Sequence, residues 1–192
     1  MLKSIIFIFL NIIYAHSIFN NFIHHHSIFL NNSIKNITFD YNSQNIDGLE
    51  AVGSGTIIVD SNNYKVILDN HIFLFKNSIF KRYNKKTNQI FIESSDPFID
   101  SLVVNFFDSN FLQTIQLDSL GWILNNSILS ENQQLAINLQ FSVDSSFIES
   151  INFTYDSFSI NLFNIIFSNL DSENSNLFKI NAPGAFILDL RD

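Results

Sequence analysis

Strict alternation of apolar and polar residues in the second half of the chain is the feature that most constrains its fold. Every second residue is apolar in QLAINLQFSVD (residues 134–144) and in ESINFTYD (residues 149–156). Successive side chains of a β-strand point to opposite faces, so each segment predicts a strand with one apolar and one polar face. Such strands are typical of antiparallel sheets that pack one face on a core and expose the other to water.

The first half of the chain carries the same period of two. It is found in residues 34–44, 49–60 and 63–70, while residues 71–94 have the pattern of three short strands that turn at Asn77-Ser78 and at 84–88. Turn residues recur about every 8 to 12 positions, which favours a meander of adjacent strands over alternating strands and helices. At 192 residues the chain has the size of one domain.

Two segments have the spacing of helices. Residues 16–32 place apolar side chains three and four apart, and residues 96–108 do the same. The second segment begins with Asp96 and Pro97, which suit the N-cap and the first position of a helix. We therefore expect a short amphipathic helix near the N-terminus and one interior helix.

The first fifteen residues, MLKSIIFIFLNIIYA, resemble an export signal. They combine an early Lys3, an apolar run over residues 5–14 and the small Ala15. The run is too short for a comfortable membrane span of about 20 residues. We predict a signal peptide over residues 1–15, cleaved after Ala15, and a soluble exported domain over residues 16–192; a buried N-terminal helix is the alternative.

Charge and cysteine content exclude several functions. The chain has 10 basic and 18 acidic residues, a net charge of −8, and its one basic cluster is residues 76–86. Nucleic-acid binding relies on clustered Lys and Arg, so we expect no nucleic-acid partner. The absence of cysteine excludes disulfides, thiolate metal sites and cysteine nucleophiles.

Motifs for catalysis or metal binding are not found. The sequence has no G-x-S-x-G elbow, H-E-x-x-H pair or phosphate-binding loop, so we predict that the protein is not an enzyme. Three consecutive histidines, 24–26, would point in three directions from a helix and have no acidic or cysteine partner nearby. We interpret them as solvated helix residues and predict neither a metal site nor a cofactor.

A large sheet with one apolar face must cover that face, and the two helical segments are the available cover. A curved sheet wrapped around them would be mainly β with helices. The chain has 22 phenylalanines, and large aromatic side chains are awkward fillers for a tightly packed core. An aromatic-lined concave sheet beneath a helical plug could hold an apolar ligand cavity. A filled core fits the alternation equally well.

Three segments resemble the outer-membrane lipoprotein carrier (LolA-like) family. NSIFKRYNKKTNQIFI (residues 77–92) resembles its hairpin, although Asn77-Ser78 stands where the family more often has Asp-Gly. SDPFIDSLV (95–103) resembles its proline-led helix, and LFKINAPGAFILDL (177–190) resembles its C-terminal strand, Pro-Gly turn and final edge strand. The order of elements over most of residues 16–192 is similar as well.

The resemblance implies a single curved antiparallel sheet that forms an unclosed half-barrel, covered by a short helical lid. It also implies a monomeric periplasmic chaperone that binds the acyl chains of lipoproteins in an apolar cavity. Such a carrier shuttles them from an inner-membrane lipoprotein-releasing complex to an outer-membrane acceptor. A periplasmic lipid- or lipoprotein-binding sensor on the same fold, without transport, is the alternative, and an interaction protein with a filled core is another.

One departure from the family concerns the lid. Family members often carry an Arg-Pro pair in the strand after the first hairpin, where the arginine latches the lid. GTIIVDSNNYKVIL (55–68) has neither, and the chain's arginines are Arg82 and Arg191. The family's latch therefore cannot be transferred to this chain.

The candidate site residues are the apolar positions of the predicted sheet and helices. Lid candidates are Phe22, Ile23, Phe98, Leu102 and Phe106. Cavity candidates for lipid binding are Val66, Leu68, Ile90, Ile92, Trp122, Leu124, Ile137, Leu139, Phe141, Ile151 and Phe153.

Overall fold

The computed structural model describes residues 20–44, 50–106, 108, 135–144, 146–155, 158–170 and 176–191. The predicted signal peptide, Trp122 and Leu124 lie outside these ranges, as does the side chain of Phe98. No helix among the described residues has the length and apolar character needed to cross a membrane.

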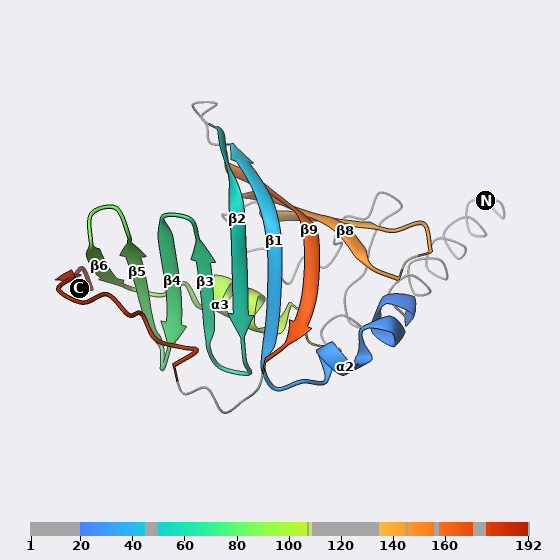
Figure 1. The fold of residues 1–192 in the computed structure, drawn as a ribbon, viewed down its shortest axis with the longest axis horizontal. Coiled ribbons are helices and arrows are strands. Elements are labelled where there is room, and N and C mark those ends of the chain that lie inside the picture. Colours follow the sequence, from blue (N-terminus) through green and yellow to red (C-terminus); the bar gives the residue numbers. More distant parts are fainter. Residues whose placement is uncertain are drawn as a thin grey trace, which may run out of the picture.

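Most described residues belong to strands (Figure 1). Residues 20–25 are helical and are followed by α2 (Ser27–Leu30), and the interior helix is α3 (Pro97–Asn105). The strands are β1 (Lys35–Gln44), β2 (Glu50–Val59), β3 (Tyr64–Leu68), β4 (His71–Lys76), β5 (Ile79–Asn84), β6 (Gln89–Glu93), β7 (Leu135–Phe141), β8 (Ile148–Tyr155), β9 (Phe158–Asn169) and β10 (Phe186–Asp189).

The strands form a single sheet in the order β10-β6-β5-β4-β3-β2-β1-β9-β8-β7. Two antiparallel meanders, β1 to β6 and β7 to β9, are joined because β9 pairs with β1. Among the described strands β10 and β7 are the two edges, so the sheet is curved but unclosed (Figure 1). This confirms the predicted half-barrel, with one exception: β10 runs parallel to β6.

Strand register places the apolar side chains of neighbouring strands on the same face. Leu139 lies opposite Ile151, and Ile151 lies opposite Leu162. Ile37 in β1 lies opposite Ile57 in β2. These residues belong to or pack against one buried cluster on the concave face of the sheet, which is the core that the period of two predicted.

Glycine in β2 gives room to an aromatic ring of that core. Gly55 pairs with Phe39 of β1, and a Cβ at Gly55 would lie 2.6 Å from the Phe39 ring and 2.8 Å from Leu68. Such a separation is a clash, so Gly55 lets the Phe39 ring lie across the neighbouring strand.

Both predicted helical segments cover the concave face. Leu102 of α3 and the adjacent Phe106 are in the buried cluster, as are Phe29 and Leu30 of α2. Figure 1 shows α3 behind β2 and β3. Asp96 accepts a hydrogen bond at Oδ1 from the backbone N–H of Ile99, and Pro97 is the first helical residue, which confirms the predicted start of α3.

Two strand predictions were wrong, one at its end and one altogether. The strand predicted for residues 134–144 ends at Phe141, and Val143 lies in the following turn with its side chain fully exposed. The strand predicted before Pro183-Gly184 does not form: residues 176–178 are a turn and 179–182 are irregular. The Pro-Gly turn is present, with Gly184 at φ 69°, and β10 follows it.

The segment before β10 has its contacts on the other face of the sheet. Tyr64 and Val66 face α3, so Lys65 between them points to the opposite face of the sheet. There Lys65 donates a hydrogen bond to the backbone oxygen of Lys179 at 2.7 Å. This segment crosses the sheet on the side away from α3 and reaches the outer edge of β6 (Figure 1). We refer to residues 176–185 as the C-terminal strap.

Candidate functional site

An apolar cavity of about 70 Å³ lies between α3 and the concave face of the sheet. Every residue that lines it has an aliphatic or phenyl side chain, so the described lining offers no charged group and no hydroxyl. The lining residues are Ile37, Phe39, Ile57, Leu102, Val103, Phe106, Ile151, Phe153, Leu162 and Ile165.

The sheet supplies the floor of this cavity from strands β1, β2, β8 and β9. Ile37 and Ile57 are register partners in β1 and β2, and Ile151 and Leu162 are partners in β8 and β9. Alternation sends each of these side chains to the concave face. The cavity therefore lies where the two meanders join.

The roof of the cavity consists of α3 and the residue that follows it. Leu102 lies in α3 and Phe106 directly follows it, four residues further along the chain, and both are buried. The Phe106 ring lies 6.0 Å from the Phe153 ring of β8, between ring centroids. The helix thus closes the cavity with the apolar stripe that its sequence spacing predicted.

One buried hydrogen bond joins α3 to the sheet beside the cavity. The hydroxyl of Tyr64 in β3 donates to Oδ1 of Asp100 at 2.7 Å. Both residues are buried, and burial together with the Asp100 carboxylate raises the pKa of Tyr64 far above its usual value. Tyr64 is therefore a neutral hydrogen-bond donor at every physiological pH. Its bond to Asp100 joins α3 to β3.

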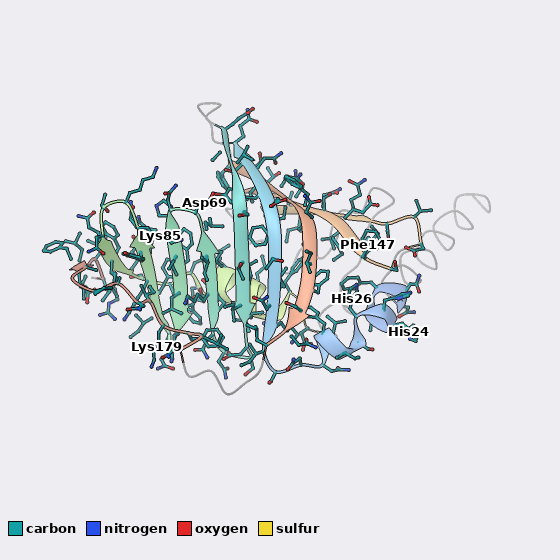
Figure 2. The ribbon with its side chains drawn as sticks, viewed as in Figure 1. His24, His26, Asp69, Lys85, Phe147 and Lys179 are labelled. Atoms are coloured by element: carbon teal, nitrogen blue, oxygen red, sulfur yellow. The ribbon has the colours of Figure 1, made fainter. Side chains whose placement is uncertain are left out.

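The N-terminal helical segment covers a different part of the concave face. The Phe22 ring lies 6.1 Å from Phe141 and 5.7 Å from Phe167, both between ring centroids. The His26 ring (labelled in Figure 2) lies edge-to-face against Phe167, with 4.9 Å between ring centroids, and its Nε2 lies 3.1 Å from the backbone oxygen of Ser146. Burial lowers the pKa of His26; the hydrogen bond with Ser146 partly opposes this shift, and His25 adds to it.

This finding separates His26 from its neighbours. His24 and His25 are exposed, as the sequence predicted for all three histidines. His26 is half-buried instead, because it ends the helical stretch over residues 20–25 and faces β9.

The structure brings some of the predicted site residues to the cavity itself and others to its surroundings. Ile151, Phe153, Leu102 and Phe106 line the cavity. Phe22, Ile137 and Leu139 belong to the same buried cluster, and Ile23, Leu68 and Phe141 pack against it. Val66 pairs with Ile57 and so lies on the same face.

Ile90 and Ile92 are corrections to the predicted set. Register pairs Ile90 with Tyr83 and Ile92 with Lys81, and those strands place both isoleucines on the face that carries Lys65 and Leu74. They lie on the opposite side of the sheet from Val66. Residues 89–93 are half-buried throughout, and residues 90–92 are three consecutive apolar side chains, so neither burial nor alternation could decide the direction of this strand.

Six lining residues were not predicted: Ile37, Phe39, Ile57, Val103, Leu162 and Ile165. The alternation of residues 34–44 and 49–60 already indicated that Ile37, Phe39 and Ile57 face the apolar side of the sheet. Leu162 and Ile165 are three residues apart and share a face only because β9 has a bulge. Asn164 adopts φ 51° there, and its side chain donates to Oδ2 of Asp40 at 2.8 Å. A strict period of two misses this pair.

Comparison with known proteins yields similarity to solved structures only. No family model matches the chain, and no curated protein matches it. A crystal structure of an uncharacterized conserved protein from Thermus thermophilus is 11% identical, with a TM-score of 0.46 over 92% of this chain and 99% of that one. A LolA superfamily protein, NE2245 from Nitrosomonas europaea, is 12% identical, with a TM-score of 0.41 over 86% of this chain and 97% of that one. These values assign no family to the chain.

Proposed function

We propose that this protein is a periplasmic carrier that binds the acyl chains of lipoproteins beneath α3 and shuttles them from the inner to the outer membrane. The observation that carries the proposal is the cavity at the junction of the two meanders, lined by ten apolar side chains and closed by a helix. A site of this composition suits hydrocarbon, and it offers no group for acid–base or nucleophilic chemistry. Binding and release are non-covalent, and no cofactor is required.

Ligand entry requires α3 to move. Sites for small ligands usually measure about 300–1,000 Å³, whereas this cavity measures about 70 Å³. An acyl chain fits when Leu102 and Phe106 leave the concave face and the chain takes their place. The bond between Tyr64 and Asp100 is broken or rearranged in that step, so it favours the closed state.

The exchange sets a minimum length for the acyl chain. Exposing Leu102 and Phe106 costs about 3–6 kcal/mol together, and each methylene that is buried returns about 0.8 kcal/mol. Loss of a hydrogen bond to a charged group adds about 1.5–3 kcal/mol. Roughly 6 to 11 buried methylenes therefore offset the opening of α3. Acyl chains of lipoproteins are long enough, and short fatty acids are not.

The near balance between closed and loaded states suits a carrier. A chain that binds with a small net free energy can pass to an acceptor with a more accessible apolar surface. The partners would be acylated lipoproteins, an inner-membrane releasing complex and an outer-membrane acceptor. A sensor on the same fold would hold its ligand without passing it on.

Native mass spectrometry with an added acylated peptide tests the proposal. We expect one-to-one adducts with the wild-type protein and fewer with Phe153→Glu, which places a charge in the cavity. Val103→Phe, which fills the cavity while keeping it apolar, should also reduce them. Phe186→Glu is the matched control, because Phe186 lies on the edge strand β10 and is 62% exposed. A wild-type protein that stays bare at high peptide concentration would overturn the proposal.

Transfer is measured separately, after binding has been observed. The loaded protein is mixed with vesicles or detergent micelles, and the acylated peptide that leaves it is quantified. Rapid transfer supports the carrier. Adducts that persist in the presence of an acceptor favour the sensor.

A further inference from the structure

A second pocket, of about 380 Å³, lies on the opposite face of the sheet beneath the C-terminal strap. Its floor is apolar and comes from β4, β5 and β6, and its wall comes from the strap. The lining residues are Leu74, Lys76, Asn77, Ile79, Lys81, Ile90, Phe178, Lys179 and Ile180. We call it the strap pocket.

Alternation along β4 separates this pocket from the cavity under α3. Phe75 pairs with Tyr64 and faces α3, so the neighbouring Leu74 faces the other side. Leu74 pairs with Lys65 on one side and with Lys81 on the other, and Lys81 pairs with Ile92. The two sites therefore have no lining residue in common.

The strap is fixed to the sheet on both sides of the pocket. At one end Lys65 donates to the backbone oxygen of Lys179 at 2.7 Å. At the other end the N–H of Phe186 donates to the oxygen of Asn88 at 3.0 Å, and that of Leu190 donates to the oxygen of Ile92 at 2.8 Å. The strap thus arches over the pocket with both ends hydrogen-bonded to the sheet. These contacts determine the shape of the pocket.

Positive charge gathers around the apolar floor. Lys76, Lys81 and Lys179 line the pocket, and Lys65 lies beside it (Figure 2 labels Lys179). These are four of the chain's 10 basic residues, in a protein whose net charge is −8. Among the described residues the ion pairs are Arg82–Glu93 and Arg191–Asp189, so the described part of the chain neutralises none of the four lysines by an ion pair.

An apolar floor with cationic groups at its rim selects one class of ligand. Leu74 is buried and Ile79, Ile90, Phe178 and Ile180 are half-buried, so this lining favours alkyl groups. Lysine side chains can lie along such a surface and keep their ammonium groups at its edge. An anionic headgroup attached to a single alkyl chain satisfies both parts, and the volume lies in the usual range for small ligands.

We propose that the strap pocket binds a single-chain anionic amphiphile, with the alkyl chain on Leu74, Ile90 and Phe178 and the anionic headgroup against Lys76, Lys81 and Lys179. A fatty-acid carboxylate and a lysophospholipid phosphate share this chemistry. The site is independent of acyl binding under α3 and stands even if that function fails.

A photoreactive dodecanoate with a diazirine near its chain end locates the site. The full chain is irradiated with the probe, and mass spectrometry of its peptides maps the adducts. We expect adducts on residues 176–180 and on β4 to β6. Adducts confined to α3, β1, β2, β8 and β9 would overturn the proposal, and they would at the same time support the cavity under α3.

Charge reversal tests the headgroup. The double variant Lys81→Glu with Lys179→Glu should weaken dodecanoate binding at this site by about tenfold, because two attractive contacts become repulsive. Lys86→Glu is the matched control, since Lys86 is exposed in the turn between β5 and β6 and does not line the pocket. Circular dichroism confirms that each variant is folded. Equal weakening by the control would overturn the headgroup assignment.

Competition by a series of ligands shows whether the pocket prefers a carboxylate or a phosphate headgroup. Dodecyl phosphate and dodecanoate are compared with neutral dodecyl maltoside at low and high salt. We expect both anions to compete with the probe at residues 176–180, more weakly at high salt, and the neutral compound to compete poorly. The better of the two anions identifies the headgroup. Equal competition by the neutral compound would show that charge has no part in recognition and would overturn the proposal.

Discussion

The hydroxyl of Tyr64 donates a 2.7 Å hydrogen bond to Oδ1 of Asp100, and this contact joins β3 to α3 in the closed state. Oδ2 of the same carboxylate is buried and has no hydrogen-bond partner among the described residues. The chain lacks the Arg-Pro pair that the LolA-like family often carries between sheet and lid. The Tyr64–Asp100 hydrogen bond joins α3 to the sheet through a tyrosine hydroxyl and a carboxylate.

Removing this contact should loosen α3. In Tyr64→Phe the buried Asp100 loses its donor, which costs about 1–3 kcal/mol of folding free energy. We expect faster hydrogen exchange in α3 and a lower urea midpoint. The double variant Tyr64→Phe with Asp100→Leu should recover much of the stability, because no polar group is then left buried.

Tyr83→Phe is the control for that variant. The Tyr83 hydroxyl donates to Oδ1 of Asn88 at 3.0 Å in the hairpin between β5 and β6, away from the helix. Its loss should leave exchange in α3 unchanged. Tyr64→Phe with unaltered exchange in α3 would contradict the role of this hydrogen bond.

Acyl chain length should set a threshold for binding to the cavity under α3. Opening α3 is offset by roughly 6 to 11 buried methylenes, so hexanoyl peptides should not bind and palmitoyl peptides should. The ratio of adduct to free protein in native mass spectra, measured from six to sixteen carbons, checks this expectation. In Tyr64→Phe the threshold should move to shorter chains. An affinity that rises evenly from the shortest chain would mean that no opening step precedes binding.

The hairpin between β4 and β5 carries strain that one substitution should relieve. Asn77 and Ser78 form its two-residue turn with φ 52° and 60°, and Ser78 has no intrinsic preference for that region. Ser78→Gly should raise the free energy of unfolding by about 1 kcal/mol. Urea denaturation measures the gain. Ser61→Gly, in the loop before β3 where no positive φ is required, should give no gain.

Acid should weaken the packing of the N-terminal helical segment. Burial lowers the pKa of His26, so the folded state favours the neutral ring. The unfolded chain binds the proton more tightly, and this contribution to stability is complete above the unfolded pKa of about 6.5 and is lost as pH falls below it.

Hydrogen exchange in residues 20–30 between pH 7.5 and pH 5, corrected for intrinsic rates, tests this expectation. We expect relative protection to fall with pH in the wild type and to change less in His26→Gln. The titratable groups near this packing contact include His25, which acts on His26, and Asp144, whose backbone oxygen accepts a hydrogen bond from Asn21. Hydrogen bonds from Ser142 and Ser146 lower the pKa of Asp144 to about 2, so it stays ionised throughout. Equal pH dependence in wild type and variant would exclude His26 as the source.

The sequence by itself determined the local elements and the side chains they bury. A period of two sends alternate residues to opposite faces whatever the neighbours are, so β1 to β8 were predicted near their observed positions. Asp96 and Pro97 determine the start of α3 because capping depends on adjacent residues only. The same locality explains why Ile151, Phe153, Leu102 and Phe106 were predicted as site residues.

Tertiary structure alone decided how those elements meet. The pairing of β9 with β1, and of β10 with β6, joins residues more than 90 positions apart, and no local pattern encodes such a pairing. The bulge at Asn164 changes which residues of β9 share a face, and a period of two carries no sign of it. The directions of Ile90 and Ile92 were decided in the same way. Residues 90–92 are all apolar and show no alternation, so only the register with β5 determines which side of the sheet each residue faces.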